Sequence, residues 1–564
     1  MDISEKKTVN ADKKTSFRKK ILCFEEIRVK EPKIEKNRVR IKVLLKKLDE
    51  DAPQANKSAG NREKKRDENR ESDNVFELIF TYPSAYSSDK LKDFIPVFRM
   101  LGCMPLMNYS LFTQRLTLEF PLSNADISLL KDFSKIFARD IFINKFVRRR
   151  TNYILPEYIP QEDEITELNA SPQAEIMPSG VYDDVVLTLS EPEKYSCAVL
   201  SSGGKESLLT YGMLKEISNK IHDVKVWPMY IAESGGHWKT ALTAYRWHIE
   251  NDPNTIKVWT NIDRFYLFML DNLKFIRKDH RRVRADTYPI RLCIFPVYIF
   301  SLLPLIGIHR IGNVLLGSEF DDPRTEAVYN GIRHYWGVYD QHKDHDLRME
   351  EWYKARMPGI RQWSAVRPIS GLVVERILVS RYPHLGSLQR SCHSCHIEME
   401  EQRGKKHKPL PEKMKSSGSK KGVVVPCGRC SKCLGILLFL LSNGADPKLM
   451  GFQKSHIDQF FSQFRSELLR LDADEKEHAL YLIKKRSEES GKDKDICIYD
   501  SKHLKNLPDG KKHEHIETIH NHESVALSLM PAQFNSPITA IIEQYTKGYS
   551  LLQKDNWVKK KTYQ

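Results

Sequence analysis

A glycine-rich segment near the middle of the chain combines the residue types that hold a phosphate group. A short apolar run at 198–200 precedes it, and apolar residues recur after it at helical spacing as far as Ile217, which predicts a strand, a tight turn and a helix. The turn reads Ser201-Ser202-Gly203-Gly204-Lys205-Glu206-Ser207. Adjacent glycines let backbone N–H groups approach an anion, and a helix start adds free N–H donors and a positive dipole end. We therefore expect an anion site here; the alternative is an ordinary strand-to-helix turn.

Cysteine spacing farther along the chain indicates a metal site. Cys427, Cys430 and Cys433 have C-X2-C-X2-C spacing, and Cys392 and Cys395 precede them across a basic loop. Structural zinc takes four thiolate or imidazole ligands in a tetrahedron, so three thiols and one upstream cysteine make a full set. Redox chemistry or an iron–sulfur cluster is the alternative. We expect zinc to hold a helix at 434–442 against the rest of the protein.

Two further predicted strands end in residues that belong beside the glycine-rich turn. The strand at 224–231 is followed by Glu233, Gly235, Gly236 and His237, and the strand at 313–317 by Ser318, Glu319, Asp321 and Asp322. Ligands of open α/β sheets bind at the carboxyl ends of the strands, so these residues share one crevice. Carboxylates there hold Mg²⁺ or orient a substrate amine, unless they face solvent. His237 contacts the ligand or is an ordinary loop histidine.

The segment 329–346 mixes aromatic, cationic and acidic residues without a clear period. Such a mixture is more typical of a substrate-recognition loop than of a core element. Arg333 is its candidate for binding a carboxylate or phosphate with two parallel hydrogen bonds. A metal held by the histidines of this segment is the less favoured interpretation.

Composition indicates a globular protein. The chain has 564 residues, 40% of them hydrophobic, which allows two to four domains with real cores. The net charge of +16 would suit nucleic acid, but much of the excess lies in lysine and arginine runs outside the periodic segments, so we do not favour that partner. The apolar stretch 292–308 contains Pro296 and Pro304 and is expected to be a buried helix, not a membrane span. No signal-peptide pattern opens the chain, so we expect a cytoplasmic protein.

The predicted fold class is α/β: a parallel, Rossmann-like sheet with helices on both faces, preceded by an α+β domain and followed by a small zinc-stabilised helical region. The expected boundaries are a basic, largely disordered arm at 1–74, an α+β domain at 75–170, a linker at 171–192, a nucleotide domain at 193–400, a basic loop at 401–424, the zinc-cysteine helices at 425–490 and a C-terminal extension at 491–564.

The glycine-rich turn resembles the Ser-Gly-Gly-X-Asp-Ser loop of the PP-loop ATP pyrophosphatases, with Glu206 where that family usually has Asp. The P-loop signature Gly-X4-Gly-Lys-Ser/Thr is absent. The resemblance implies that the loop grips the β,γ-pyrophosphate of ATP while a substrate oxygen attacks the α-phosphorus. It assigns pyrophosphate binding to Ser202, Gly203, Gly204 and Ser207. Lys205 then neutralises charge nearby, and Glu206 and Glu319 are the candidate Mg²⁺ ligands.

The order of motifs between residues 75 and 442 resembles two groups within that superfamily. One is 7-cyano-7-deazaguanine synthase, which activates a carboxylate with ATP and carries a four-cysteine zinc site. The other, closer in layout, is the UDP-N-acetylmuramoyl-L-alanyl-L-glutamate epimerase family. By that match Cys392 is the upstream zinc ligand. The resemblance implies a small carboxylate substrate activated as an acyl-adenylate, followed by epimerisation of a terminal glutamyl residue, or by ligation or amidation.

Two other classes of function stay open at this stage. One is a nucleic-acid-binding or nucleic-acid-modifying protein that uses its basic arms, which predicts steep loss of binding with salt. The other is a regulatory ATP-binding module without turnover, for which Glu206 is the only hint. The oligomeric state and the base for any Cα proton removal are not predicted.

Overall fold

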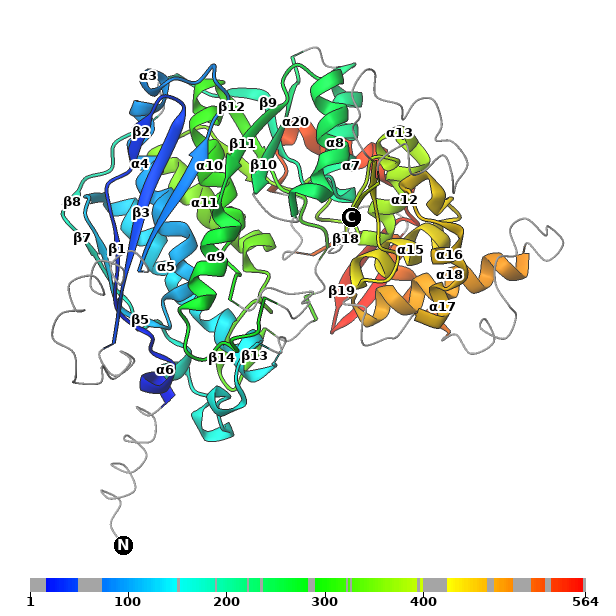
Figure 1. Ribbon diagram of the computed structural model, residues 1–564. Helices are drawn as coiled ribbons and strands as arrows, with labels where there is room; N and C mark the ends of the chain where they lie inside the picture. The colour runs from blue at the N-terminus through cyan, green and yellow to red at the C-terminus, as the bar shows by residue number, and fades with distance from the viewer. Residues whose placement is uncertain are drawn as a thin grey trace, which may run out of the picture.

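The computed structural model describes most of the chain. The described residues are 17–48, 74–149, 153–187, 190–220, 223–233, 237–281, 290–320, 323–324, 327–392, 396–398, 423–463, 471–489, 509–522 and 529–560. They form a mixed α/β protein with an eleven-stranded central sheet and, on one side of it, a smaller and mainly helical C-terminal part (Figure 1).

Five parallel strands make one half of the sheet. They are β9 (Glu193–Leu200), β10 (Lys225–Glu233), β11 (Ile256–Thr260), β12 (Ile311–Leu315) and β15 (Arg361–Trp363), in the spatial order β15-β12-β9-β10-β11. Numbered along the chain, that order is 3-2-1-4-5 when read from β11. This is the doubly wound arrangement, in which the strand order reverses between the first and fourth strands. The predicted parallel sheet is confirmed.

Helices cover both faces of this half. Along β9, Cys197 and Val199 belong to one buried apolar cluster and Ala198 to another, because successive side chains of a strand point to opposite faces. The first cluster includes α7 (Lys205–Ser218), α8 (His237–Asn251), α12 (Gly371–Arg381) and α20 (Ala532–Glu543). The second includes α9 (Ile262–Asp271), α10 (Phe295–Ile308) and α11 (Lys343–Arg356). The apolar helix expected within 292–308 is therefore α10, and it is buried.

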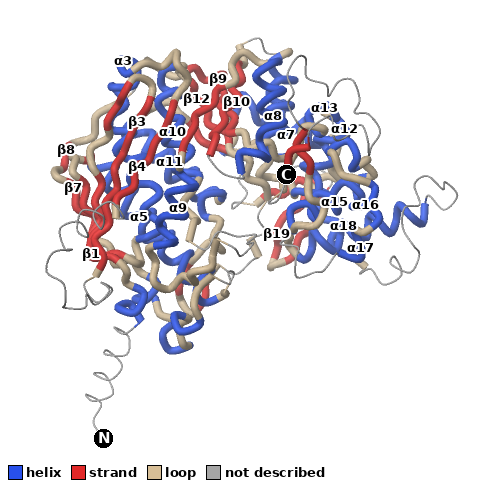
Figure 2. The backbone as a smooth tube through the Cα atoms, viewed as in Figure 1, coloured by secondary structure: helices blue, strands red, loops and turns tan. Residues whose placement is uncertain are grey.

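The other half of the sheet corrects two sequence predictions. It consists of β4 (Val75–Thr81), β3 (Arg38–Lys47), β1 (Phe24–Val29), β5 (Thr113–Leu118) and β7 (Glu175–Pro178), with β2 (Lys33–Glu35) beside β3. β4 pairs antiparallel with β11, so the strands form one continuous band (Figure 2). The expected disordered arm is wrong for residues 17–48, the expected linker is wrong for β7, and the α+β region shares its sheet with the parallel half.

The charge content of β3 explains why its sequence resembles that of a disordered basic arm. Val39, Ile41 and Val43 are fully buried, whereas Arg40 and Lys42 between them lie on the more open face. Arg40 on that face donates to Glu77 of β4 at 2.6 Å, so the charges are paired across the sheet. A half-buried strand with a cationic outer face has the same composition as a solvated arm, and only the alternation distinguishes them.

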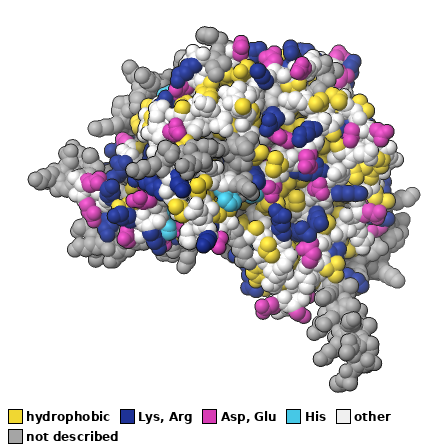
Figure 3. All heavy atoms as spheres, turned by 180° about the vertical axis from the view of Figure 1, so that it is seen from behind, with side chains coloured by type: hydrophobic (Ala, Val, Ile, Leu, Met, Phe, Trp, Pro, Cys, Tyr) yellow, Lys and Arg dark blue, Asp and Glu magenta, His cyan; other side chains and the backbone are white. Residues whose placement is uncertain are grey.

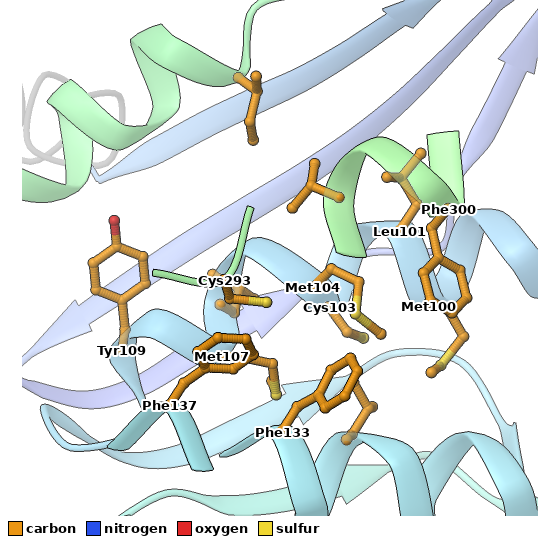
Figure 4. Close-up of a cluster of buried hydrophobic side chains, with 14 of the residues drawn as sticks. Met100, Leu101, Cys103, Met104, Met107, Tyr109, Phe133, Phe137, Cys293 and Phe300 are labelled. Carbon is orange, nitrogen blue, oxygen red and sulfur yellow. The ribbon is translucent and has the colours of Figure 1, made fainter. Parts of the chain in front are cut away.

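The N-terminal half packs on the parallel half through a sulfur-rich and aromatic core (Figure 4). Met100 and Cys103 come from α4 (Ile95–Cys103), Phe133 and Phe137 come from α5 (Asn124–Ile141), and Phe300 comes from α10. All of these side chains are fully buried, so α10 belongs to the cores of both halves. Among the described residues, no helix combines the length and apolarity needed to cross a membrane.

The C-terminal part is built on α15 (Ser431–Asn443) and α18 (Ala473–Glu489), which share an apolar cluster. The extension that showed no pattern in the sequence is folded at 509–522 and 529–560. It forms the 3-10 segment η10 (Gly510–Glu517), the sheet β18-β19-β20 and α20, and Phe534 and Ile538 of α20 are buried in the cluster of α7 and α12. The basic loop at 401–422 lies outside the described residues.

The remaining described elements are short. They are α3 (Ser88–Leu91), α6 (Glu167–Ala170), α13 (Pro383–Gly386), α16 (Lys454–Asp458), α17 (Phe460–Gln463), β6 (Leu122–Ser123), β8 (Val181–Tyr182), β13 (Val328–Tyr329), β14 (Ile332–Arg333), β16 (His396–Glu398), β17 (Val423–Val425), β18 (Ile519–Asn521), β19 (Tyr549–Gln553) and β20 (Asn556–Lys560), with 3-10 and π turns between several of them.

Candidate active site

The predicted turn between β9 and α7 is confirmed. Gly203 has φ +75°, and a Cβ atom there would lie 2.9 Å from the Thr240 carbonyl oxygen of α8, so both the backbone conformation and the close approach require glycine. Gly204 precedes the first residue of α7, and no side chain caps that helix end. The first N–H groups of α7 therefore have no side-chain acceptor of the usual kind, as in helix ends that receive anions.

A cavity of about 330 Å³ lies at the carboxyl ends of β9, β10 and β12. It therefore lies where the strand order reverses, which is the position of ligand sites in doubly wound sheets. The size is within the range of small-molecule sites. Its wall contains polar residues from all three strand ends and from α7, namely Ser201, Ser202, Glu206, Ser207, Glu233 and Glu319, together with Thr240, Tyr298, Gln341 and Lys432.

A charged cluster stands at the base of this cavity. The Lys205 ammonium donates to Glu319 at 2.6 Å and also to the neighbouring Glu206. Burial disfavours the Lys205 ammonium, but the charges of Glu206 and Glu319 outweigh burial and raise the pKa of Lys205 above its ordinary value. Burial and the adjacent Glu206 charge raise the pKa of Glu319 against the effect of Lys205. Lys205 thus pairs with both carboxylates. The sequence predicts that these three residues lie close together, and they do.

Two more carboxyl groups, which sequence reasoning missed, are buried around the same cluster. Burial raises the pKa of Glu375 in α12 to about 7, and the charges of Glu206 and Glu319 add to that rise. Burial likewise raises the pKa of Glu475 in α18 to about 8, with the Glu319 charge as the next cause. The cluster therefore contains more acidic groups than cations, so a divalent cation bound at Glu206 and Glu319 would relieve their repulsion. The residues fit the predicted Mg²⁺.

Lys432 is a second missed residue, and it comes from the cysteine segment. It lies at the cavity edge, and its charge favours the ionised forms of Glu206 and Glu319. The same helix, α15, contributes Phe439, whose ring centroid lies 5.9 Å from the Lys205 ammonium. A Cβ atom on Gly371 would meet both Glu319 and Phe439, so these groups pack closely. The cysteine helix therefore packs against the parallel half, where the sequence predicts it.

Four cysteines converge beside this helix. The sulfur atoms of Cys392, Cys427, Cys430 and Cys433 all lie within 4.8 Å of one another. The pairs Cys427–Cys433 and Cys392–Cys430 are each 3.9 Å apart, close to the edge of about 3.8 Å that Zn–S bonds of about 2.3 Å give in a tetrahedron. Cys392 is thus the upstream member of the set. Four thiols with no fifth position fit a structural zinc, and Cys395 lies outside the described residues.

Several predicted residues are not brought to the cavity or fall outside the description. Gly235, Gly236, Asp321 and Asp322 lie outside the described residues, and of His237 only the backbone, the first residue of α8, is described. Arg333 lies on the two-stranded hairpin β13-β14, where its side chain is 67% exposed and 3.7 Å from Asp344. Its side chain is not part of the cavity wall, so the role of Arg333 in binding a carboxylate or phosphate stays a prediction.

Arg291 is the guanidinium group that approaches the cavity. It is buried and donates to Glu233 at 2.7 Å and to the Tyr298 hydroxyl at 2.9 Å, and both of those acceptors line the cavity. The sequence presents Arg291 only as one of several basic residues before an apolar helix. Its pairing with Glu233, 58 residues away, follows from the sheet and has no local signal.

Comparisons of the chain with models of protein families, with curated proteins and with solved structures give no significant match. The function is therefore argued from the geometry of this chain.

Proposed function

We propose that this protein is an ATP-dependent enzyme of the PP-loop pyrophosphatase type that activates a substrate carboxylate as an acyl-adenylate. The observation that carries the proposal is the uncapped glycine turn at the end of the first strand of a 3-2-1-4-5 sheet, opening on a polar cavity. ATP, Mg²⁺ and a small carboxylate are the ligands that it requires.

The residues of the turn bind the pyrophosphate part of ATP. Backbone N–H groups of Gly203 and Gly204 and the positive end of α7 provide the anion seat. The hydroxyls of Ser202 and Ser207 lie at the cavity wall and add hydrogen bonds. Glu206 and Glu319 would hold Mg²⁺, which would supply neutralisation of the leaving pyrophosphate. Lys205, the first residue of α7, donates to phosphate oxygens and stabilises the charge that develops there.

The opposite wall receives the carboxylate substrate. Glu233 and Tyr298 line the cavity there, and Arg291 fixes the Glu233 carboxylate from behind. A buried acceptor of this kind suits a substrate amine, so we propose an amino acid or peptidyl acid as the substrate. Its carboxylate attacks the α-phosphorus, the bond to pyrophosphate breaks, and the acyl-adenylate forms. Whether the adenylate is then epimerised, amidated or ligated decides between the two related groups named above.

A cytoplasmic location belongs to the same proposal, because ATP and reduced thiols for zinc occur together there. A nucleic-acid partner is not favoured: on the face that Figure 3 shows, which is turned away from the viewer in Figure 1, described lysine and arginine side chains lie among aspartate and glutamate side chains. Nucleic-acid binders gather their cations on one face or along one helix.

The proposal is tested by the products of ATP. ATP labelled at the α- or the γ-phosphate is incubated with Mg²⁺ and a panel of amino acids, nucleotide-linked peptides and deazaguanine acids. AMP and pyrophosphate are expected with one of them. Ser207→Ala should lower that rate by roughly 100-fold, the effect of removing a donor from a developing charge. Ser218→Ala is the matched control, because it lies at the other end of α7 and donates only to the Lys215 carbonyl. ADP and phosphate as products would contradict adenylation.

A further inference from the structure

A second group of metal-ligating side chains lies outside the cavity and the cysteine cluster. Asp474 is in the first turn of α18, and His513 and His515 are in η10, which packs along α18 in the C-terminal part. One ligand atom from each lies within 4.8 Å of the other two. The three side chains are 25%, 12% and 8% exposed, so they are largely shielded from solvent.

The backbone of η10 brings both histidines to one carboxylate. Side chains two residues apart on a regular helix do not face the same neighbour. His513 departs from helical geometry, with φ −100° and ψ 31°, and this kink directs its ring toward Asp474 together with that of His515. The His515 ring is further held by a stacked contact with Trp557 of β20, at 6.0 Å between ring centroids and 12° between planes.

Two of the three ligand-to-ligand distances are close to the edges of a metal tetrahedron. Asp474 Oδ2 lies 3.2 Å from His513 Nδ1 and 3.6 Å from His515 Nε2. Zn–N and Zn–O bonds of about 2.0–2.2 Å give ligand-to-ligand edges of about 3.3–3.6 Å in a tetrahedron. The same Asp474 oxygen accepts from Arg324 at 2.6 Å, and a carboxylate oxygen with two lone pairs can accept a hydrogen bond and bind a metal together.

The two ring nitrogens of His513 have different neighbours. Its Nε2 is hydrogen-bonded to the Glu477 carboxylate at 3.1 Å, and its Nδ1 lies 3.2 Å from Asp474. A neutral imidazole that donates from Nε2 keeps a lone pair on Nδ1, which is the atom that would bind a metal beside Asp474. A metal at Nδ1 leaves the Nε2 proton for Glu477, which is the carboxylate–histidine–metal arrangement that orients metal ligands in proteins.

A cavity of about 290 Å³ lies beside one of the three residues. Asp474 lines it together with Arg324, Asp472 and Glu475 among others, whereas His513 and His515 do not. Two histidines and one carboxylate differ in kind from the set of four cysteines and are ligands that zinc accepts.

We propose that Asp474, His513 and His515 form a second metal site that binds a divalent transition metal of the zinc type. The site does not depend on the proposed ATP chemistry, and its ligands differ in kind from those of the cysteine cluster.

Metal counting tests the proposal. The full-length protein is treated with a chelator, reloaded with Zn²⁺ alone, freed of excess metal and analysed by mass spectrometry of the metal. The wild type should retain two zinc ions per chain, and the double variant His513→Ala/His515→Ala should retain one. If the double variant fails to fold, Asp474→Asn replaces it in the test, because this substitution keeps the shape of the side chain. Asp474→Asn should weaken zinc binding at the second site by at least tenfold.

Cobalt substitution assigns the ions, because thiolate-bound Co²⁺ has strong sulfur-to-metal absorption that a histidine–carboxylate site lacks. Cys430→Ser should remove that absorption while the second metal stays. Glu514→Gln is the control, since Glu514 lies between the two histidines in sequence and is 3.8 Å from Lys559; it should keep two zinc ions. One zinc in the wild type, or two in the histidine double variant, would overturn the proposal.

Discussion

Two buried groups in this molecule each pair acidic with basic side chains. One is enclosed in the core, and the other lies beside a cavity. Asp126 and Arg356 meet at 3.5 Å in the core of the N-terminal half, and both are fully buried. Asp126 also accepts from the Trp352 indole at 2.8 Å and belongs to the capping box of α5. Its partners are fixed and complete, so this pair is structural.

The Lys205 group is arranged differently. Lys205 is shared between Glu206 and Glu319, both carboxylates line a cavity, and further acids stand behind them. Its carboxyl groups outnumber its lysines, and Lys205 is the first residue of α7, whose start has no side-chain cap. The difference teaches that burial and pairing alone do not identify a site; a shared cation and carboxyl groups with raised pKa values beside an open space do. The two groups should therefore respond to substitution in opposite ways.

The largest effect on stability is expected at the enclosed pair. Asp126→Ala should lower the free energy of unfolding by about 3–5 kcal/mol, because it leaves the Arg356 charge buried without its carboxylate. Denaturant unfolding measures it. Asp132→Ala on the same helix is the control; its carboxylate is half exposed and pairs with Arg348 at the surface, so less than about 1 kcal/mol is expected. Equal losses for the two variants would remove the structural role of Asp126.

Lys205→Met should lower activity strongly and stability less than Asp126→Ala does. Formation of AMP and pyrophosphate should fall by roughly 100- to 1,000-fold, because the ammonium that stabilises the developing phosphate charge is gone. The loss of unfolding free energy should be smaller than for Asp126→Ala, since Glu319 regains neutrality by taking up a proton. Lys215→Met, on the more exposed part of α7, is the control. A Lys205→Met protein that is unstable but fully active per folded molecule would reverse the comparison.

The pH dependence of stability, measured through Glu375, distinguishes the two groups further. Its pKa is raised to about 7 in the folded protein from an ordinary 4.5, so between these pH values the folded state binds more protons than the unfolded state, and stability falls as pH rises. Glu375→Gln should remove this loss and stabilise the protein at pH 8 by up to about 3 kcal/mol relative to the wild type, with little difference near pH 4. Thermal unfolding across that range measures it. An unchanged pH profile would show that Glu375 is ionised in the folded state.

Lys432 should give the smallest effect. Lys432→Met should lower the efficiency of ATP turnover by about tenfold, roughly 1.4 kcal/mol, because the lysine lies at the cavity edge rather than at its base. Zinc content should stay unchanged, since both neighbouring cysteines are retained. Lys448→Met, beyond the end of α15, is the control. Loss of zinc together with activity would mean that the substitution acts on the cysteine cluster and not on the cavity.

The sequence reveals those parts of the site whose signal is local. The turn at 201–207, the acid after the fourth strand and the cysteine spacing all lie within short segments, so composition and period were sufficient. Glu375, Glu475 and Lys432 reach the same place from helices that are far apart in the chain, and each is unremarkable within its own helix. Nothing short of the tertiary fold brings them together.

The fold was predictable to a similar degree and for the same reason. The parallel half alternates strands and helices with strong periods, so the sequence predicts an apolar helix at 292–308 and a strand at 313–317. The structure has α10 at Phe295–Ile308 and β12 at Ile311–Leu315. The half containing β1 and β3 was hidden because its outer face carries lysine and arginine, and the role of α20 was hidden because its partners lie in α7 and α12. The mixed segment around Arg333 forms a surface hairpin, so its composition does not place that side chain at the cavity.

The central claim is that the glycine turn seats pyrophosphate, and calorimetric titration of pyrophosphate with Mg²⁺ tests it without knowledge of the substrate. The wild type should bind one pyrophosphate per chain. Gly204→Ala should weaken binding by at least tenfold, because the added Cβ lies where the anion approaches and within 2.9 Å of the Glu206 carboxylate. Gly180→Ala, where a Cβ makes only an ordinary contact with Pro121, should bind as the wild type does. No binding to the wild type, or equal binding to both variants, would contradict the account.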